Sequence, residues 1–113
     1  MRPPRLAAQV LVTGLLRIAS GEGGTGAVLA RGDADAGGIV VLLAERGRAI
    51  RLLERGSTPD GAPAWLPRPL PGGESGELDA YLDRRRARDP DLWIVELDVA
   101  DSERFGAAMT AAD

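Results

Sequence analysis

The chain has 113 residues, a net charge of −3, and neither cysteine nor histidine. A chain of this length forms one domain around a single hydrophobic core. The missing residue types exclude thiolate and imidazole catalysis, disulfides and most zinc or iron sites, and a pI near 5.0 disfavours a general nucleic-acid binder.

The first predicted element is a helix over residues 5–20, because apolar side chains recur there at helical spacing. The apolar run 6–16 follows two arginines, as in a secretory signal peptide. However, Gln9 and Thr13 interrupt the run, and Arg17 stands where a small-residue cleavage site would lie. We therefore expect no signal peptide and no membrane span, and the lack of disulfides fits a cytoplasmic location.

The next predicted elements are strands. They cover residues 27–31, 39–44, 48–55, 64–68 and 92–99. The run 39–44 is apolar at every position, which is typical of a central strand covered on both faces. Residues 48–55 alternate only loosely, so a strand is favoured there and a helix stays the alternative. Pro67 and Pro69 confine the strand at 64–68 to a sheet edge.

Two further helices complete the pattern. One covers residues 76–88 and ends before Asp89-Pro90, and a short one follows the last strand, capped by Asp101 or Ser102. The linker 69–75 is rich in proline and glycine and is expected to be mobile.

The order of these elements predicts the fold class. We expect a single α+β domain over residues 1–113, with an ordered core at about 5–106 and a frayed tail at 107–113. Its mostly antiparallel sheet has about five strands, with an N-terminal helix, a helix before the last strand and a short C-terminal helix.

Three stretches of the sequence resemble a known family. They are PRLAAQVLVTGLLR near the N-terminus, the block GAVLARGDADAGGIVVLL, whose RGDADAG we take for a hairpin, and YLDRRRARDPDLWIVELD near the C-terminus. Together they resemble a family of short bacterial proteins described only as a domain of unknown function. The resemblance covers about residues 4–105, and RDPDLW at 88–93 is its most specific piece. It implies a single domain in a cytoplasmic setting, and it supplies no activity, cofactor or catalytic residue.

Asp33 and Asp35 stand two residues apart in a glycine-rich stretch, as do the ligands in some cation-binding loops. An EF-hand loop would need a third acidic residue where Gly37 stands, and the next acid, Glu45, lies beyond an apolar strand. Asp and Gly are equally the residues of tight turns. We therefore predict turn residues here, and we expect neither a metal site nor a cofactor.

All 14 basic residues are arginines, and several gather before the last strand. Arg85 lies on the apolar side of its predicted helix, where an unpaired charge would be costly. We therefore predict a structural ion pair between Arg85 and Glu96 or Asp98. The alternative is a site for an anion or for a partner's carboxylate. That site would consist of Arg84, Arg85, Arg86, Arg88 and Trp93.

The sequence thus favours a small cytoplasmic protein with a binding or assembly role and no catalysis, because it offers no nucleophile–base pair and no ligand cluster. Its partner would be a second copy, another protein or an anionic ligand, with neither DNA nor a membrane involved. A homodimer would bury Trp65 of the edge strand, unless that ring packs on the helix at 76–88 of its own chain.

Two alternative functions stay open. A metal-assisted hydrolase or transferase would need four carboxylates to converge in space. These are Asp33, Asp35, Glu96 and Asp98. An accessory protein that contacts RNA would use the arginines from Arg84 to Arg88.

Overall fold

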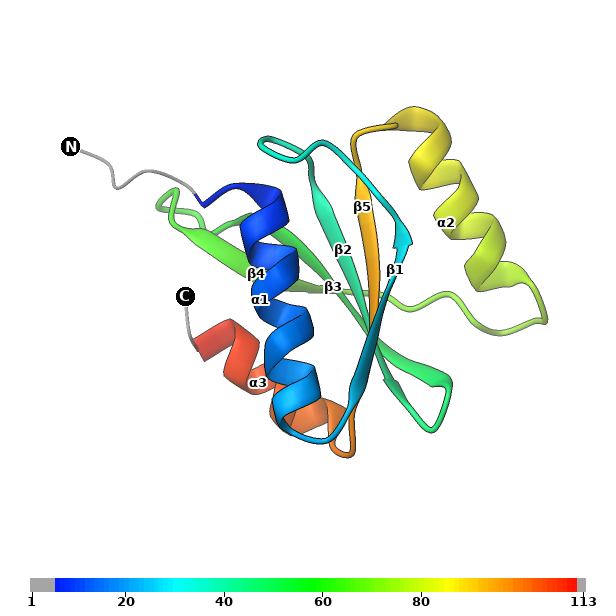
Figure 1. The fold of residues 1–113 in the computed structure, drawn as a ribbon. Helices are drawn as coiled ribbons and strands as arrows, with labels where there is room; N and C mark the ends of the chain where they lie inside the picture. Colours follow the sequence, from blue (N-terminus) through cyan, green and yellow to red (C-terminus); the bar gives the residue numbers. More distant parts are fainter. Residues whose placement is uncertain (1–5, 112–113) are drawn as a thin grey trace.

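The structure is a computed structural model, and it describes residues 6–111 as three helices and a five-stranded sheet (Figure 1). The helices are α1 (Ala8–Gly21), α2 (Glu77–Arg88) and α3 (Ser102–Ala111). The strands are β1 (Thr25–Ala30), β2 (Ile39–Glu45), β3 (Arg48–Ser57), β4 (Pro63–Arg68) and β5 (Trp93–Asp98). The predicted α+β fold class and order of elements are confirmed, and the ambiguous segment at 48–55 is a strand.

The strand order in the sheet is β1-β5-β2-β3-β4. Neighbouring strands are antiparallel except for the central pair β2 and β5, which is parallel. The prediction that RGDADAG forms a hairpin is therefore wrong, because β5 lies between β1 and β2. The two most buried strands pair at the centre of the sheet, where both of their faces are covered. Residues 31–38 must consequently cross the end of β5.

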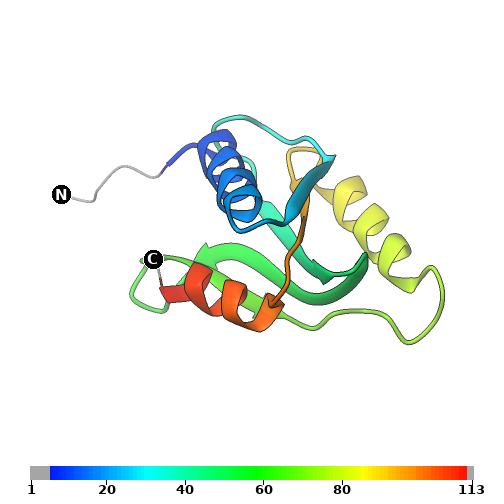
Figure 2. The same ribbon diagram turned by 60° about the horizontal axis from the view of Figure 1, so that its bottom comes forward.

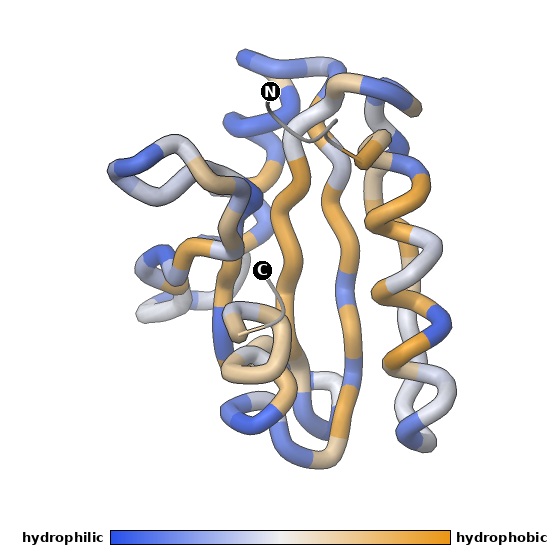
Figure 3. The backbone as a smooth tube through the Cα atoms, turned by 90° about the vertical axis from the view of Figure 1, so that its left-hand side faces the viewer, coloured by the Kyte–Doolittle hydropathy of each residue, from blue (hydrophilic) through white to orange (hydrophobic). Residues whose placement is uncertain are grey.

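Two apolar layers lie on opposite faces of the sheet. Helices α1 and α3 cover one face and α2 covers the other (Figure 2). Side chains alternate along each strand, so Val41 and Val95 belong to the first layer and Val40 and Ile94 to the second. Hydrophobic residues follow the middle strands in Figure 3. β2 is buried from residue 39 to residue 44, which confirms its prediction as a central strand.

Trp65 is buried within its own chain, but not against the helix that the sequence suggested. The residue is 4% exposed and lies in the layer that contains Phe105 and Met109 of α3. The alternation along β4 directs the ring to the face opposite α2, so packing on α2 is excluded. β4 is an edge strand, as predicted.

The C-terminal helix extends further than expected. α3 continues to residue 111 and buries Met109, so the helix is longer than the sequence predicted, and fraying of its end stays a prediction. Its cap is the predicted one, because the Asp101 carboxylate accepts a hydrogen bond from the Arg104 amide at 3.0 Å. The first five residues and residues 112–113, where the ordered core and the tail were predicted to begin and end, lie outside the described residues. The mobility of the linker 69–75 stays a prediction.

None of the helices within residues 6–111 has the length and apolar character needed to cross a membrane.

Candidate functional site

The two most distinctive sequence segments meet at one end of the sheet. The Asp33 amide donates a hydrogen bond to the Asp91 carbonyl at 3.0 Å, and the Trp93 amide donates one to the Gly38 carbonyl at 2.8 Å. The Trp93 indole N–H donates to the Asp33 carbonyl at 2.7 Å, across 60 residues of sequence. Residues 31–38 and 89–93 therefore form one hydrogen-bonded unit, which we call the loop junction.

Glycines allow the two halves of the loop junction to approach each other. A Cβ atom on Gly32 would lie 2.1 Å from the Asp91 carbonyl oxygen, and one on Gly37 would lie 2.3 Å from the same atom. Neither distance is sterically possible, so both positions require glycine. The glycines that suggested a simple turn are thus needed because a distant segment packs against them.

Arg86 holds the loop junction from α2. Its Nη1 atom lies 3.0 Å from the Arg31 carbonyl oxygen, 2.8 Å from that of Pro90 and 2.6 Å from that of Leu92. The Arg31 guanidinium lies over the Trp93 ring, 5.6 Å from its centroid. Because Trp93 is buried and Arg86 binds carbonyl groups, both side chains have a structural role.

The anion site that was the alternative to an ion pair is accordingly not assembled as one patch. Arg85 and Arg86 are engaged within the chain, and buried Trp93 presents no ring for stacking on a base. Arg84 and Arg88 are exposed. They are the members of the cluster that could still contact an anion or a partner.

Arg85 is paired, but its partner is Glu54 and not Glu96 or Asp98. The pair is bidentate, with Nη2 2.7 Å from Oε2 and Nη1 3.1 Å from Oε1. Since α2 ends just before β5 begins, Arg85 lies over the start of β5, where Glu54 is level with Ile94. Glu96 and Asp98 lie on the same face but roughly 7 and 13 Å further along the strand. The predicted partners therefore lie on the correct face of the sheet but too far along β5 to reach Arg85.

The ion pair shifts the pKa of both groups. Hydrogen bonds from Arg85 lower the pKa of the Glu54 carboxyl, outweighing the effect of partial burial. The hydrogen bond to Glu54 in turn raises the pKa of the Arg85 guanidinium. Tyr81 contributes through its hydroxyl, which accepts a hydrogen bond from Arg85 at 3.1 Å. The side chains of the pair are 25% and 23% exposed, so it is a half-buried link between α2 and β3.

The four carboxylates of the metal hypothesis are not brought together. Asp98 lies at the end of β5 away from the loop junction. Its carboxylate accepts hydrogen bonds from the amides of Arg46 at 3.1 Å and Gly47 at 2.6 Å, in the turn between β2 and β3. Among the residues that the structure describes, no three acidic side chains are grouped so that they could hold a metal ion.

Asp33 is a turn residue within the loop junction, as predicted. Its Oδ2 atom accepts hydrogen bonds from the amides of Asp35 at 3.1 Å and Ala36 at 2.8 Å. The carboxylate of Asp35 makes no hydrogen bond with any of residues 6–111. The two acids that look alike in sequence therefore differ in structural role.

This difference can be measured. We expect Asp33→Ala to lower the free energy of unfolding by about 1 kcal/mol, because two turn amides lose their acceptor. The matched control Asp35→Ala should change it by less than about 0.5 kcal/mol. Urea denaturation at neutral pH measures both values. Equal losses in the two variants would contradict the assignment of Asp33 as the turn-forming acid.

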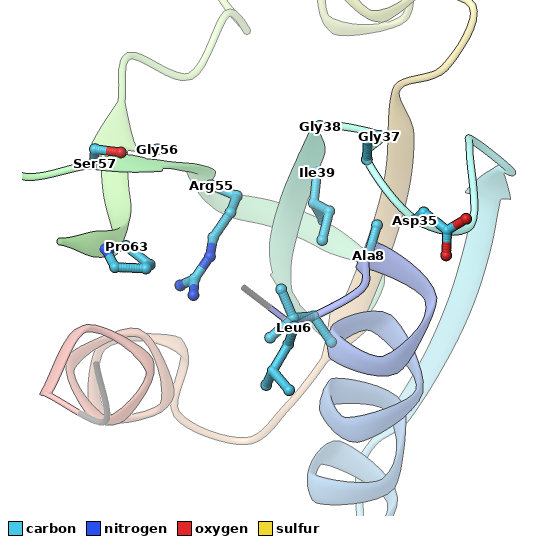
Figure 4. Close-up of a pocket in the computed structure, with 12 residues that line it drawn as sticks. Leu6, Ala8, Asp35, Gly37, Gly38, Ile39, Arg55, Gly56, Ser57 and Pro63 are labelled. Carbon is cyan, nitrogen blue, oxygen red and sulfur yellow. The ribbon is translucent and has the colours of Figure 1, made fainter. Parts of the chain in front are cut away.

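A cavity of about 340 Å³ opens beside the loop junction (Figure 4). Leu6 and Ile39 form part of its apolar wall. The Arg55 guanidinium points into it, whereas the carboxylate of Asp35 points away from Arg55. The Arg55 guanidinium also lies over the Trp65 ring, 5.0 Å from its centroid. The volume suits a small ligand, but most of the wall is apolar or glycine.

The two edges of the sheet differ in a way that bears more directly on function. β4 carries Pro63 and Pro67, which protect an edge against further pairing. β1 has no proline and no charged residue, and it is exposed along almost its whole length. Val28 and Leu29 are 41% and 52% exposed. The uncharged sequence TGAVLA is the feature of the sequence that indicates this open edge.

Solved structures of bacterial proteins share this fold. A crystal structure of a DUF1491 family protein from Caulobacter crescentus CB15 matches with a TM-score of 0.75 and 32% identity, over 87% of this chain and 92% of that one. An NMR structure of a DUF1491 family protein from the same organism gives 0.73 and 32%, over 88% and 91%. Protein Atu0922 from A. tumefaciens gives 0.65 and 30%, over 87% and 89%. No curated protein matches the chain.

The family model described as "Protein of unknown function (DUF1491)" matches residues 6–107. This range contains the whole loop junction and the open edge of β1. The resemblance that the sequence segments suggested is thereby confirmed. The chain belongs to the DUF1491 family.

Proposed function

We propose that the protein is a non-catalytic, cytoplasmic assembly module that binds another polypeptide by pairing a strand with the edge of β1. The observation that carries this proposal is the open edge itself. It combines an uncharged sequence, free backbone groups and exposed apolar side chains, which is the combination that strand addition uses.

The register of the sheet identifies the free backbone groups of β1. The amides of Trp93 and Val99 donate to carbonyls on the β2 side, so the odd-numbered residues of β5 face β2 and the even-numbered ones face β1. Glu96, an even-numbered residue, pairs with Ala27. The amide and carbonyl groups of Ala27 therefore point inward, and those of Gly26 and Val28 point outward.

The chemistry of the chain supports a role without catalysis. It has no histidine or cysteine to act as base or nucleophile. The carboxylate and guanidinium of Glu54 and Arg85 are bound to each other in a structural pair. Asp98 is likewise engaged with backbone amides of a turn.

The proposal is tested by photo-crosslinking in the cell that makes the protein. A photoreactive phenylalanine analogue replaces Val28 on the open edge or, as a control, Ile50, an apolar residue of β3 that is 37% exposed. We expect a covalent protein adduct from position 28 and none from position 50. Absence of an adduct at position 28, or equal adducts at both positions, would refute binding through β1.

A further inference from the structure

We infer that the strand accepted by β1 is β1 of a second copy, paired antiparallel so that Gly26 of each copy lies opposite Val28 of the other. This inference rests on the proposed function and names its partner. The two sheets would then join into one continuous sheet across a two-fold axis at Ala27.

Hydrogen bonding selects this register. Outward-facing residues must oppose outward-facing residues, and in β1 these are Gly26 and Val28. β1 pairs regularly with β5 only up to Val28, because a bulge lies between Val28 and Ala30. Placing Gly26 opposite Val28 uses the free amide and carbonyl of both residues in both copies. A shift by two residues in either direction leaves one of these residues without a partner.

Side-chain size also favours a second copy. Gly26 and Val28 lie on the face of the sheet that α1 covers. Leu16 of α1 covers Gly26 so closely that a Cβ there would be 2.5 Å from its Cδ2 atom. In the pairing, the exposed Val28 of the second copy lies across from Gly26 and beside this Leu16. The Val28 side chain of each copy thereby fills the space beside Gly26 of the other copy. The two-fold axis makes two equivalent apolar contacts of this kind.

Charge is complementary at both ends of the paired strands. The nearest charged residues that flank β1 are Glu22 before it and Arg31 after it. An antiparallel arrangement places the Arg31 end of each copy beside the Glu22 end of the other. Both residues are exposed, and Glu22 has no ion-pair partner among residues 6–111. Like charges of the two copies are thus kept apart. Between Glu22 and Arg31 the strand carries no charge that would oppose self-pairing.

A disulfide test addresses both the partner and the register, because the natural chain has no cysteine. In the inferred pairing, the two Ala27 residues form a non-hydrogen-bonded pair with Cα atoms about 4.5 Å apart, within the range that a disulfide spans. We expect Ala27→Cys to form covalent dimers when the folded protein is treated with oxidised glutathione. The matched control Val28→Cys should not, since its two Cα atoms would be roughly 8 Å apart.

Sedimentation equilibrium of the natural chain between micromolar and high micromolar concentrations provides the second measurement. We expect a monomer–dimer equilibrium, and hydrogen exchange should show the Gly26 and Val28 amides protected only in the dimer. A monomer at every concentration, or a dimer that leaves these amides unprotected, would overturn the inference. So would cross-linking of Val28→Cys in place of Ala27→Cys. An adduct of position 28 with a different protein would then leave the proposed function standing and exclude only the second copy.

Discussion

Replacing Gly32 with alanine is expected to lower the free energy of unfolding by about 3 kcal/mol or more, the largest effect of any substitution considered. The added methyl group would lie 2.1 Å from the Asp91 carbonyl oxygen. That oxygen belongs to backbone whose position is fixed by the hydrogen bond from Asp33. The loop junction therefore cannot relax around the methyl group without losing its own hydrogen bonds.

Gly72 provides the matched control for this substitution. It lies in the linker after β4, and a Cβ added there would meet no atom within 4 Å. Gly72→Ala should change the stability by less than about 0.5 kcal/mol. Urea denaturation of the two variants gives the comparison, and the fluorescence of Trp93 in a Trp65→Phe background reports on the loop junction itself. A loss below about 1 kcal/mol for Gly32→Ala would show that the two segments are not held in close contact.

The second large effect is expected at the ion pair between helix α2 and strand β3. Arg85→Ala should cost about 2–3 kcal/mol, because it leaves the half-buried Glu54 carboxylate without its main partner. Arg84→Ala is the control, since Arg84 is exposed on the same helix, and it should cost less than about 0.5 kcal/mol. Thermal and urea unfolding at pH 7 measure both losses. A loss below about 1 kcal/mol for Arg85→Ala would mean that water replaces the pair at little cost.

The same pair makes stability depend on pH in a defined direction. The pKa of Glu54 is lower in the folded chain than its ordinary value, so the folded state binds a proton less readily than the unfolded state does. The stabilisation is therefore complete above the unfolded pKa and is lost as the pH falls through the folded pKa. Between about pH 5 and pH 3, the natural chain should lose more stability than Glu54→Gln does. Parallel pH profiles of the two proteins would contradict this.

Local sequence patterns were sufficient to predict the helices and strands of the fold, but not which strands pair with one another. The apolar run at 39–44 could only be a central strand, and the prolines of β4 identified an edge. The insertion of β5 between β1 and β2 depends on a contact between residues far apart in the chain, which periodicity does not record. For this reason the prediction that RGDADAG forms a hairpin is wrong, and the close contact that requires glycine at position 32 could not be predicted.

The ion pair shows the same boundary between local and non-local information. Helical spacing placed Arg85 on the apolar side of α2 and correctly required a carboxylate. Strand alternation correctly placed Glu96 and Asp98 on the face that α2 covers. No local pattern gives the position along the strands at which α2 packs on the sheet. In the position that α2 takes, Arg85 contacts Glu54 on β3. Asp98 lies too far along β5 and instead accepts hydrogen bonds from the turn after β2.

The central position of β5 has a consequence for how the chain folds. Strands β2, β3 and β4 are joined by short turns and can pair as soon as they are made. β1 precedes them in the sequence but has no neighbour until β5 arrives, and β5 is the last strand to be synthesised. The apolar edge of β2 and the whole of β1 therefore stay unpaired until β5 has been synthesised. Unpaired strands are prone to associate wrongly during this period. Closing the sheet joins residues far apart in the chain, so this step, rather than formation of the local meander, is expected to set the folding rate.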